Sequence, residues 1–151
     1  MKKIVLILGF LFYTPICLAT DNIVGFWTTI DDETKQAKSI VQIYEYNNKY
    51  YGRVVDLLKN KEATAQIKGN PKIIGLDIIW DLKKSGQKYT GGNILDPQKG
   101  KIYGCEIWKE NNNLIVRGKI AFLGRNQTWL PNTEYKAQNT ESLFPDLSHI
   151  K

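Results

Sequence analysis

The sequence of 151 residues predicts an all-β fold, an eight-stranded antiparallel up-and-down barrel. Three observations support this prediction. Short segments with alternating apolar and polar residues follow one another through most of the chain, and residues that favour tight turns separate them. No long amphipathic pattern lies between these segments, so the helical crossovers that parallel strands need are missing. Closing the sheet also removes its exposed edges.

Four segments in the first half of the chain are expected to form strands. In the second of them Val41 and Ile43 share one face, and Asn47 and Asn48 supply a tight turn because asparagine tolerates positive φ. The fourth segment is apolar nearly throughout, so a short helix remains an alternative to a strand. The four segments are Ile23–Ile30, Ser39–Tyr46, Lys49–Leu58 and Ile73–Trp80.

Four further segments in the second half of the chain complete the predicted barrel. Asp96–Gly100, "DPQKG", is a turn in which proline presets φ and glycine closes the bend. Tyr103, Cys105 and Ile107 then share one face of a clearly alternating strand. Leu123–Arg125 is expected to turn the chain into the last strand. The four segments are Gln87–Leu95, Lys101–Lys109, Leu114–Phe122 and Asn126–Leu130.

The N-terminal segment, residues 1–19, is predicted to be a secretory signal peptide. Lys2 and Lys3 precede the uncharged, largely apolar run Ile4–Tyr13, and the small residues Cys17 and Ala19 lie three and one positions before Thr20. The apolar run is shorter than the roughly 20 residues of a membrane-spanning helix. We therefore expect a periplasmic or secreted protein with no stable membrane anchor. An uncleaved anchor or a lipid on a cysteine is the less favoured alternative.

The rest of the chain is expected to form one barrel domain, residues 20–131, and a polar C-terminal tail, residues 132–151. This length suits a single domain with one core. Removal of Lys2 and Lys3 with the signal peptide lowers the formal charge from +6 to +4. The remaining charges are scattered and no basic run alternates with aromatic residues, so we expect no nucleic-acid partner.

Residue combinations that carry catalysis or bind metals are scarce in this sequence. His149 is the single histidine and lies near the C-terminus, which argues against a zinc site and against a nucleophile–base pair. Asp31, Asp32 and Glu33 are interpreted as a solvated turn, because no loop of suitably spaced oxygen ligands surrounds them. The sequence therefore predicts no enzyme activity, no cofactor and no metal site.

Cysteine content and aromatic content bear on the barrel interior. Cys105 is the one cysteine outside the predicted signal peptide, so a buried free thiol or an intermolecular bridge is expected. Tyrosine and tryptophan recur through the strands and suit either a ligand cavity or an ordinary core. If the barrel holds a ligand, the predicted lining is Val41, Ile43, Tyr103, Cys105, Ile107 and Val116. The alternative is that the same side chains fill the barrel.

Several short stretches in order resemble a bacterial family known as domain of unknown function 2147, small exported proteins with a lipocalin-like barrel. The stretches include "GFW" at Gly25–Trp27, "IYEYNNKYYGRVV" at Ile43–Val55, "GLDII" at Gly75–Ile79, "GGNILDPQKGKIYGCEI" at Gly91–Ile107, "LIVRG" at Leu114–Gly118 and "LGRNQTW" at Leu123–Trp129. The resemblance spans about Ile23–Leu130. It implies a calycin-type barrel, export and a small apolar ligand.

The resemblance also implies structural roles for four residues. In lipocalins a Gly-x-Trp pair on the first strand lies at the closed end, and a late arginine packs across the indole ring. Trp27 would then be a structural plug, and Gly25 would let the backbone pass closely. Arg117 and Arg125 are the candidates for the stacked arginine.

These observations favour an exported lipocalin-like protein that binds a small, largely apolar ligand without catalysis. One alternative is a structural or interaction protein of the cell envelope with a filled barrel. An envelope hydrolase is the least favoured interpretation, since no nucleophile–base pair is evident.

Overall fold

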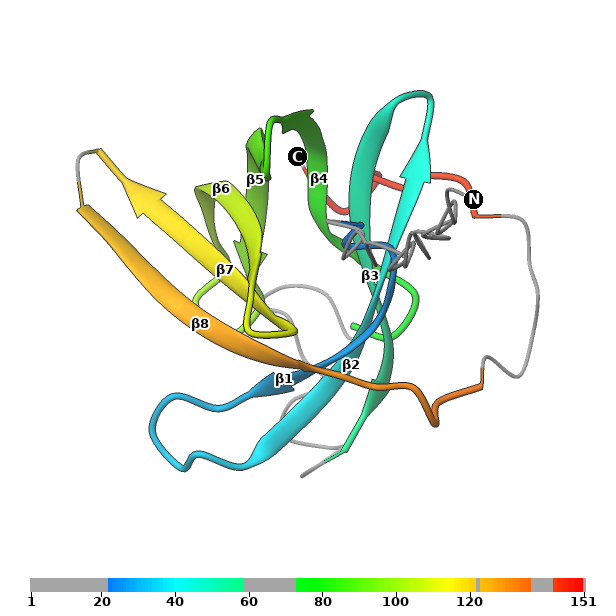
Figure 1. Ribbon diagram of the computed structural model, residues 1–151, viewed down its shortest axis with the longest axis vertical. Coiled ribbons are helices and arrows are strands. Elements are labelled where there is room, and N and C mark those ends of the chain that lie inside the picture. Colours follow the sequence, from blue (N-terminus) through cyan, green and yellow to red (C-terminus); the bar gives the residue numbers. More distant parts are fainter. Residues whose placement is uncertain (1–21, 59–72, 122, 137–142, 151) are drawn as a thin grey trace, which may run out of the picture.

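The computed structural model describes residues 22–58, 73–121, 123–136 and 143–150, and its eight strands form a closed antiparallel barrel (Figure 1). The predicted fold class is therefore confirmed. The predicted signal peptide lies outside the described residues. The strands are β1 (Gly25–Ile30), β2 (Ala37–Tyr46), β3 (Lys49–Leu57), β4 (Asp77–Ser85), β5 (Lys88–Asp96), β6 (Lys101–Glu110), β7 (Asn113–Ile120) and β8 (Leu123–Pro131).

Each strand pairs with the next along the chain, and β8 returns to β1 to close the barrel. The closing contact is short, because only Trp27 with Pro131 and Thr28 with Leu130 are in register there. The rest of β8 follows β7 alone, and the β7–β8 hairpin reaches outward from the other strands (Figure 1). Among the described residues, no helix has the length and apolar character needed to cross a membrane.

One row of inward-facing residues runs around the barrel wall. Ile43 lies opposite Gly52, Gly52 opposite Ile79, Ile79 opposite Ile94, and Ile94 opposite Tyr103. Directly opposed residues of antiparallel strands share one face of the sheet. Because Ile43 and Ile79 are fully buried, this face is the interior of the barrel.

Two glycines allow the interior to pack closely on one side of the barrel. A β-carbon at Gly52 would lie 3.1 Å from both Ile43 Cδ1 and Ile79 Cβ. A β-carbon at Gly92 would lie 2.6 Å from the backbone oxygen of Trp80 and 2.7 Å from Leu82 Cγ. This part of the interior therefore leaves no room for a side chain at either glycine.

The predicted bounds were wrong for β4 and for β8. The segment predicted as Ile73–Trp80 is a strand and not a helix, but β4 begins at Asp77 and continues through polar residues to Ser85. The turn predicted at Leu123–Arg125 lies inside β8. The chain instead turns around Ala121, which has a φ of 52°.

The C-terminal segment, residues 143–150, lies against the outer face of β2, β3 and β4, where Asp77 is fully buried. The Asp77 carboxylate accepts hydrogen bonds from the Tyr44 hydroxyl at 2.7 Å, Arg53 Nη2 at 2.9 Å and the Asp146 amide at 2.9 Å. His149 Nε2 donates to the Asp77 backbone oxygen at 2.9 Å. These bonds offset the cost of burying a carboxylate and attach the C-terminal segment to the wall.

The Tyr44 hydroxyl of this outer cluster has a strongly shifted pKa. Burial, followed by its hydrogen bond to Asp77, raises the pKa of the Tyr44 hydroxyl far above its ordinary value. The Arg53 guanidinium lies over the Tyr44 ring, 5.4 Å from the ring centroid. The Tyr51 ring stacks on the Tyr44 ring with 5.6 Å between their centroids. Arg53 also donates to the backbone oxygen of Phe144. The cluster is therefore a structural connection between the barrel and its C-terminal segment.

Candidate functional site at the open end of the barrel

All six residues predicted to line a ligand site face the barrel interior. Tyr103 and Ile43 belong to the inward-facing row, and Cys105, Ile107, Val41 and Val116 continue the same face along their strands. Their exposure differs sharply. Tyr103 is half-buried, whereas the other five belong to the buried core: Val41, Ile43, Cys105, Ile107 and Val116. The deep interior is packed, so Tyr103 is the predicted residue best placed to meet a ligand.

The inward face becomes exposed toward the β7–β8 hairpin. Gly118 lies opposite Cys105, so Ile120, two residues further along, also faces inward, and Leu123 lies opposite Ile120. Yet Ile120 is 61% exposed and Leu123 is 66% exposed, while Cys105 on the same face is 3% exposed. Apolar side chains that face inward but meet solvent mark this end of the barrel as open.

We use the term open end for the inward face formed by Ile94, Tyr103, Gly118, Ile120 and Leu123. Ile94 and Tyr103 are half-buried and lie opposite each other across β5 and β6. A β-carbon at Gly118 would lie 3.8 Å from Tyr103 Cβ and 3.9 Å from Ile94 Cγ2, which is ordinary contact distance. The open end is thus an apolar surface that is less tightly packed than the region around Gly52.

A chain of polar side chains borders the open end along β8. The buried indole of Trp129 donates to Gln127 Oε1 at 3.3 Å, and Gln127 Nε2 donates to Asp32 Oδ2 at 2.9 Å. Arg125 Nη2 lies 2.9 Å from the same Asp32 oxygen. Arg125 lies opposite Gly118 and therefore faces inward as well. This chain joins β8 to the turn between β1 and β2.

Trp27 is a buried core residue, but neither candidate arginine stacks on it. Its indole donates to the Ile23 backbone oxygen at 2.8 Å, and Trp27 is 5% exposed. Arg117 follows inward-facing Val116 and lies on the outer face, with its guanidinium over Gly124. Arg125 pairs instead with Asp32 at the open end. The predicted arginine stacking is therefore wrong for both residues, because the strand register directs them elsewhere.

Gly25 is required for a different reason than close backbone passage. Its φ is 142°, a conformation that residues with a side chain rarely adopt, and a β-carbon there would have no neighbour within 4 Å. The first strand thus needs glycine at this position for its backbone angle and not for space.

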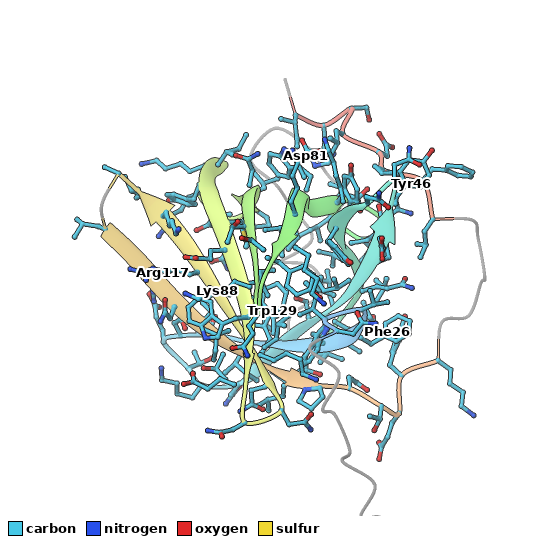
Figure 2. The ribbon with its side chains drawn as sticks, turned by 45° about the horizontal axis from the view of Figure 1, so that its top comes forward. Phe26, Tyr46, Asp81, Lys88, Arg117 and Trp129 are labelled. Atoms are coloured by element: carbon cyan, nitrogen blue, oxygen red, sulfur yellow. The ribbon has the colours of Figure 1, made fainter. Side chains whose placement is uncertain are left out.

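The potentially reactive side chains of the described region lie apart. Cys105 is free and buried on the inner face, and burial raises the pKa of its thiol to about 12. His149 is held on the outer face by the Asp77 backbone. Trp129 lies near the centre of the barrel in Figure 2, whereas Arg117 lies farther out along β7 and β8. Within the described residues, no group of histidine, cysteine, aspartate and glutamate side chains is suited to hold a metal ion.

Sequence reasoning missed most of the open end. Its prediction centred on mid-strand positions of Cys105 and Val116 and did not include Ile94, Ile120 or Leu123. The alternation that continues from Gly118 to Ile120 was the available signal for Ile120. The role of Gln127 was not visible, because it depends on a turn residue 95 positions earlier in the chain.

The fold and the inward apolar face define a lipocalin-like β-barrel. A family model described as an uncharacterized protein conserved in bacteria, DUF2147, matches residues 25–130. The match covers most of the chain, so the chain belongs to this family, as its sequence motifs predicted. A comparison with curated proteins found no match.

A comparison with solved structures gives an independent likeness. The chain is similar to protein HP1028 from Helicobacter pylori, which is described as belonging to the lipocalin family. The TM-score is 0.61 with 21% sequence identity, and the alignment covers 76% of this chain and 86% of that chain. At this identity the likeness supports the fold and no more.

Proposed function

We propose that this protein is an exported lipocalin-like binding protein that holds a small, largely apolar ligand at the open end of its barrel. The observation that carries the proposal is the exposure of Ile120 and Leu123, at 61% and 66%, on the inward face. Binding becomes more favourable by roughly 25 cal/mol for each Å² of apolar surface that a ligand removes from water. Tyr103 adds a half-buried ring beside them.

The proposed ligand lies against the outer part of the inward face and does not enter the packed core. Val41, Ile43 and Ile107 are each 0% exposed, so a ligand reaching them would have to displace core atoms. The filled-barrel alternative therefore applies to the deep interior, and the binding hypothesis applies to the open end. The binding hypothesis predicts that an apolar probe binds at the open end, whereas a barrel that is filled throughout predicts no probe binding.

A pair of glycine substitutions on opposite faces tests the proposal. Gly118→Leu places a side chain among the open-end residues, and Gly104→Leu places one beside Lys119 on the outer face. Neither glycine has a positive φ, so both variants should fold with stability changes of about 1 kcal/mol or less. The measurement is the fluorescence titration of each variant with N-phenyl-naphthylamine, an uncharged apolar probe.

We expect Gly118→Leu to raise the dissociation constant about tenfold or more, and Gly104→Leu to leave it unchanged. Tenfold corresponds to roughly 1.4 kcal/mol of lost binding free energy. Equal effects of the two substitutions, or no binding of the probe to the native protein, would reject the open end as a binding site. The filled-barrel interaction protein would then be the better hypothesis.

Binding without catalysis is part of the proposal. Cys105 and His149 lie on opposite faces of the barrel wall, and a thiol with a pKa of about 12 is a poor nucleophile at neutral pH.

Export is supported by the order of residues 1–19, a basic start followed by an apolar run and a small residue. Intact-mass analysis of the protein from an extracellular or periplasmic fraction tests it. A mass that retains residues 1–19 would contradict cleavage.

A further inference from the structure

Arg125 is a charged residue of the open end that faces the apolar surface and is accessible to solvent. Lys101 and Asp96, which lie opposite each other, continue the same inward face beyond Tyr103 and Ile94. Arg125 lies on the inward face opposite Gly118, and its side chain is 65% exposed. Its ion-pair partner, Asp32, has a side chain that is 24% exposed and belongs to the turn between β1 and β2. The guanidinium therefore has donors directed both to Asp32 and to solvent at the edge of the binding surface.

We propose that the ligand is an amphiphile with an anionic carboxylate head, and that the head binds Arg125 while the apolar part lies on Ile120, Leu123 and Tyr103. This proposal rests on the proposed function and names the ligand class for the same site. Arginine recognises carboxylates through two parallel N–H donors, which gives both charge and geometric selectivity. An uncharged ligand would leave this group unused.

The exchange of Asp32 for a ligand carboxylate leaves no group without a partner. Asp32 Oδ2 also accepts a hydrogen bond from Gln127 Nε2 at 2.9 Å, so Asp32 keeps a protein donor when Arg125 turns to the ligand. Gln127 is itself positioned by the buried indole of Trp129, which donates to its Oε1 atom. Because the Arg125 side chain is 65% exposed, the ion pair contributes little to stability and a ligand can compete with Asp32 for it.

This arrangement predicts opposite effects for the two members of the ion pair. Replacing Arg125 removes the cation that receives the carboxylate. Replacing Asp32 by the neutral isostere asparagine removes the competing carboxylate and leaves Arg125 available. A purely structural ion pair would behave differently, since loss of either member would disturb the site in the same direction.

The experiment compares a dansyl-labelled undecanoic acid with its methyl ester, which has the same chain and no charge. For the native protein we expect the acid to bind about fivefold more tightly than the ester, and the difference to shrink as salt is added. Arg125→Gln should abolish the difference by weakening the acid alone. Arg125→Lys should retain part of it, and Asp32→Asn should tighten binding of the acid about twofold or more.

Arg117→Gln is the matched control, because Arg117 lies on the outer face of the adjacent strand and its loss removes the same charge from the protein. Equal binding of acid and ester to the native protein would overturn the proposal. So would equal losses in Arg117→Gln and Arg125→Gln, or weaker acid binding in Asp32→Asn. Titration with the uncharged naphthylamine separates the two levels: its binding persists if only the head-group inference fails and is absent if the proposed function fails.

Discussion

Arg53 and Asp77 form an ion pair on the outer face of the barrel wall, with 2.9 Å between Nη2 and Oδ2 and with the carboxylate excluded from solvent. The same carboxylate binds the Tyr44 hydroxyl from β2 and the Asp146 amide from the C-terminal segment. One buried side chain thus joins three strands to a segment 69 residues away in sequence. The open end lies elsewhere, on the inward face of β5 to β8.

The first prediction compares two aspartates of β4. Asp77→Asn leaves Arg53 and Tyr44 without their buried anion and should lower the free energy of unfolding by about 3 kcal/mol. Asp81 pairs with Lys49 at 2.7 Å, but both side chains are 39% exposed, so Asp81→Asn should cost less than about 1 kcal/mol. Urea denaturation measures both. Similar costs for the two variants would show that the Asp77 cluster is not the stabilising connection described above.

The second prediction concerns the C-terminal segment. A chain that ends at residue 142 lacks the Asp146 amide and the His149 ring, two of the groups that bind Asp77. It should unfold at a lower urea concentration, and Asp77→Asn should cost less in the shortened chain than in the full chain, because coupled groups are not additive. The small effect of Asp81→Asn should be the same in both chains. An undiminished effect of Asp77→Asn in the shortened chain would indicate that the segment does not couple to the cluster.

The third prediction separates Trp27 from the two arginines. Trp27→Ala removes a buried indole and should cost about 3–5 kcal/mol. Arg117→Ala and Arg125→Ala should each cost less than about 1 kcal/mol, because neither side chain packs on Trp27 and Arg125 is 65% exposed. Thermal or urea unfolding measures all three variants. A large loss for either arginine would restore the stacking hypothesis that the register argues against.

The fourth prediction follows from the buried thiol. Burial raises the pKa of Cys105 from 9.0 to about 12, so the folded state favours the protonated thiol. Its contribution to stability is fully present below about pH 9 and is lost as the pH rises toward about 12. The urea concentration at the unfolding midpoint should decrease between about pH 8 and about pH 10.5, and this decrease should be larger for the native protein than for Cys105→Val. A thiol reagent should react quickly only after denaturation, and rapid labelling of the folded protein would contradict the burial of Cys105.

The sequence predicted the strands well where apolar and polar residues alternate and both ends carry turn residues. Lys101–Lys109 is such a segment, and β6 spans Lys101–Glu110. The prediction from the sequence was wrong at the start of β8. Gly124 is typical of a turn but lies inside the strand, where the Arg117 guanidinium covers it. The true turn uses Ala121 at positive φ, for which the sequence contains no glycine signal.

The parts of the molecule that depend on distant pairs were not predictable. The role of Asp77 is one example, because its partners Tyr44 and Asp146 lie 33 residues before it and 69 residues after it. The inward parity of Tyr103 and Cys105 was predictable from alternation alone. How deeply each inward-facing residue is buried was not predictable, since burial depends on where neighbouring strands end and on which hairpin extends beyond the barrel.

Methyl NMR of isoleucine side chains during titration with the naphthylamine probe tests the central claim most directly. Ile94 and Ile120 face inward at the open end, Ile115 is buried elsewhere, and Ile102 is 48% exposed on the outer face near the same end. If the ligand binds at the open end, the methyl signals of Ile94 and Ile120 shift with a common dissociation constant while those of Ile102 and Ile115 stay in place. Shifts confined to Ile102, or equal shifts of all four signals, would contradict a binding site on the inward face.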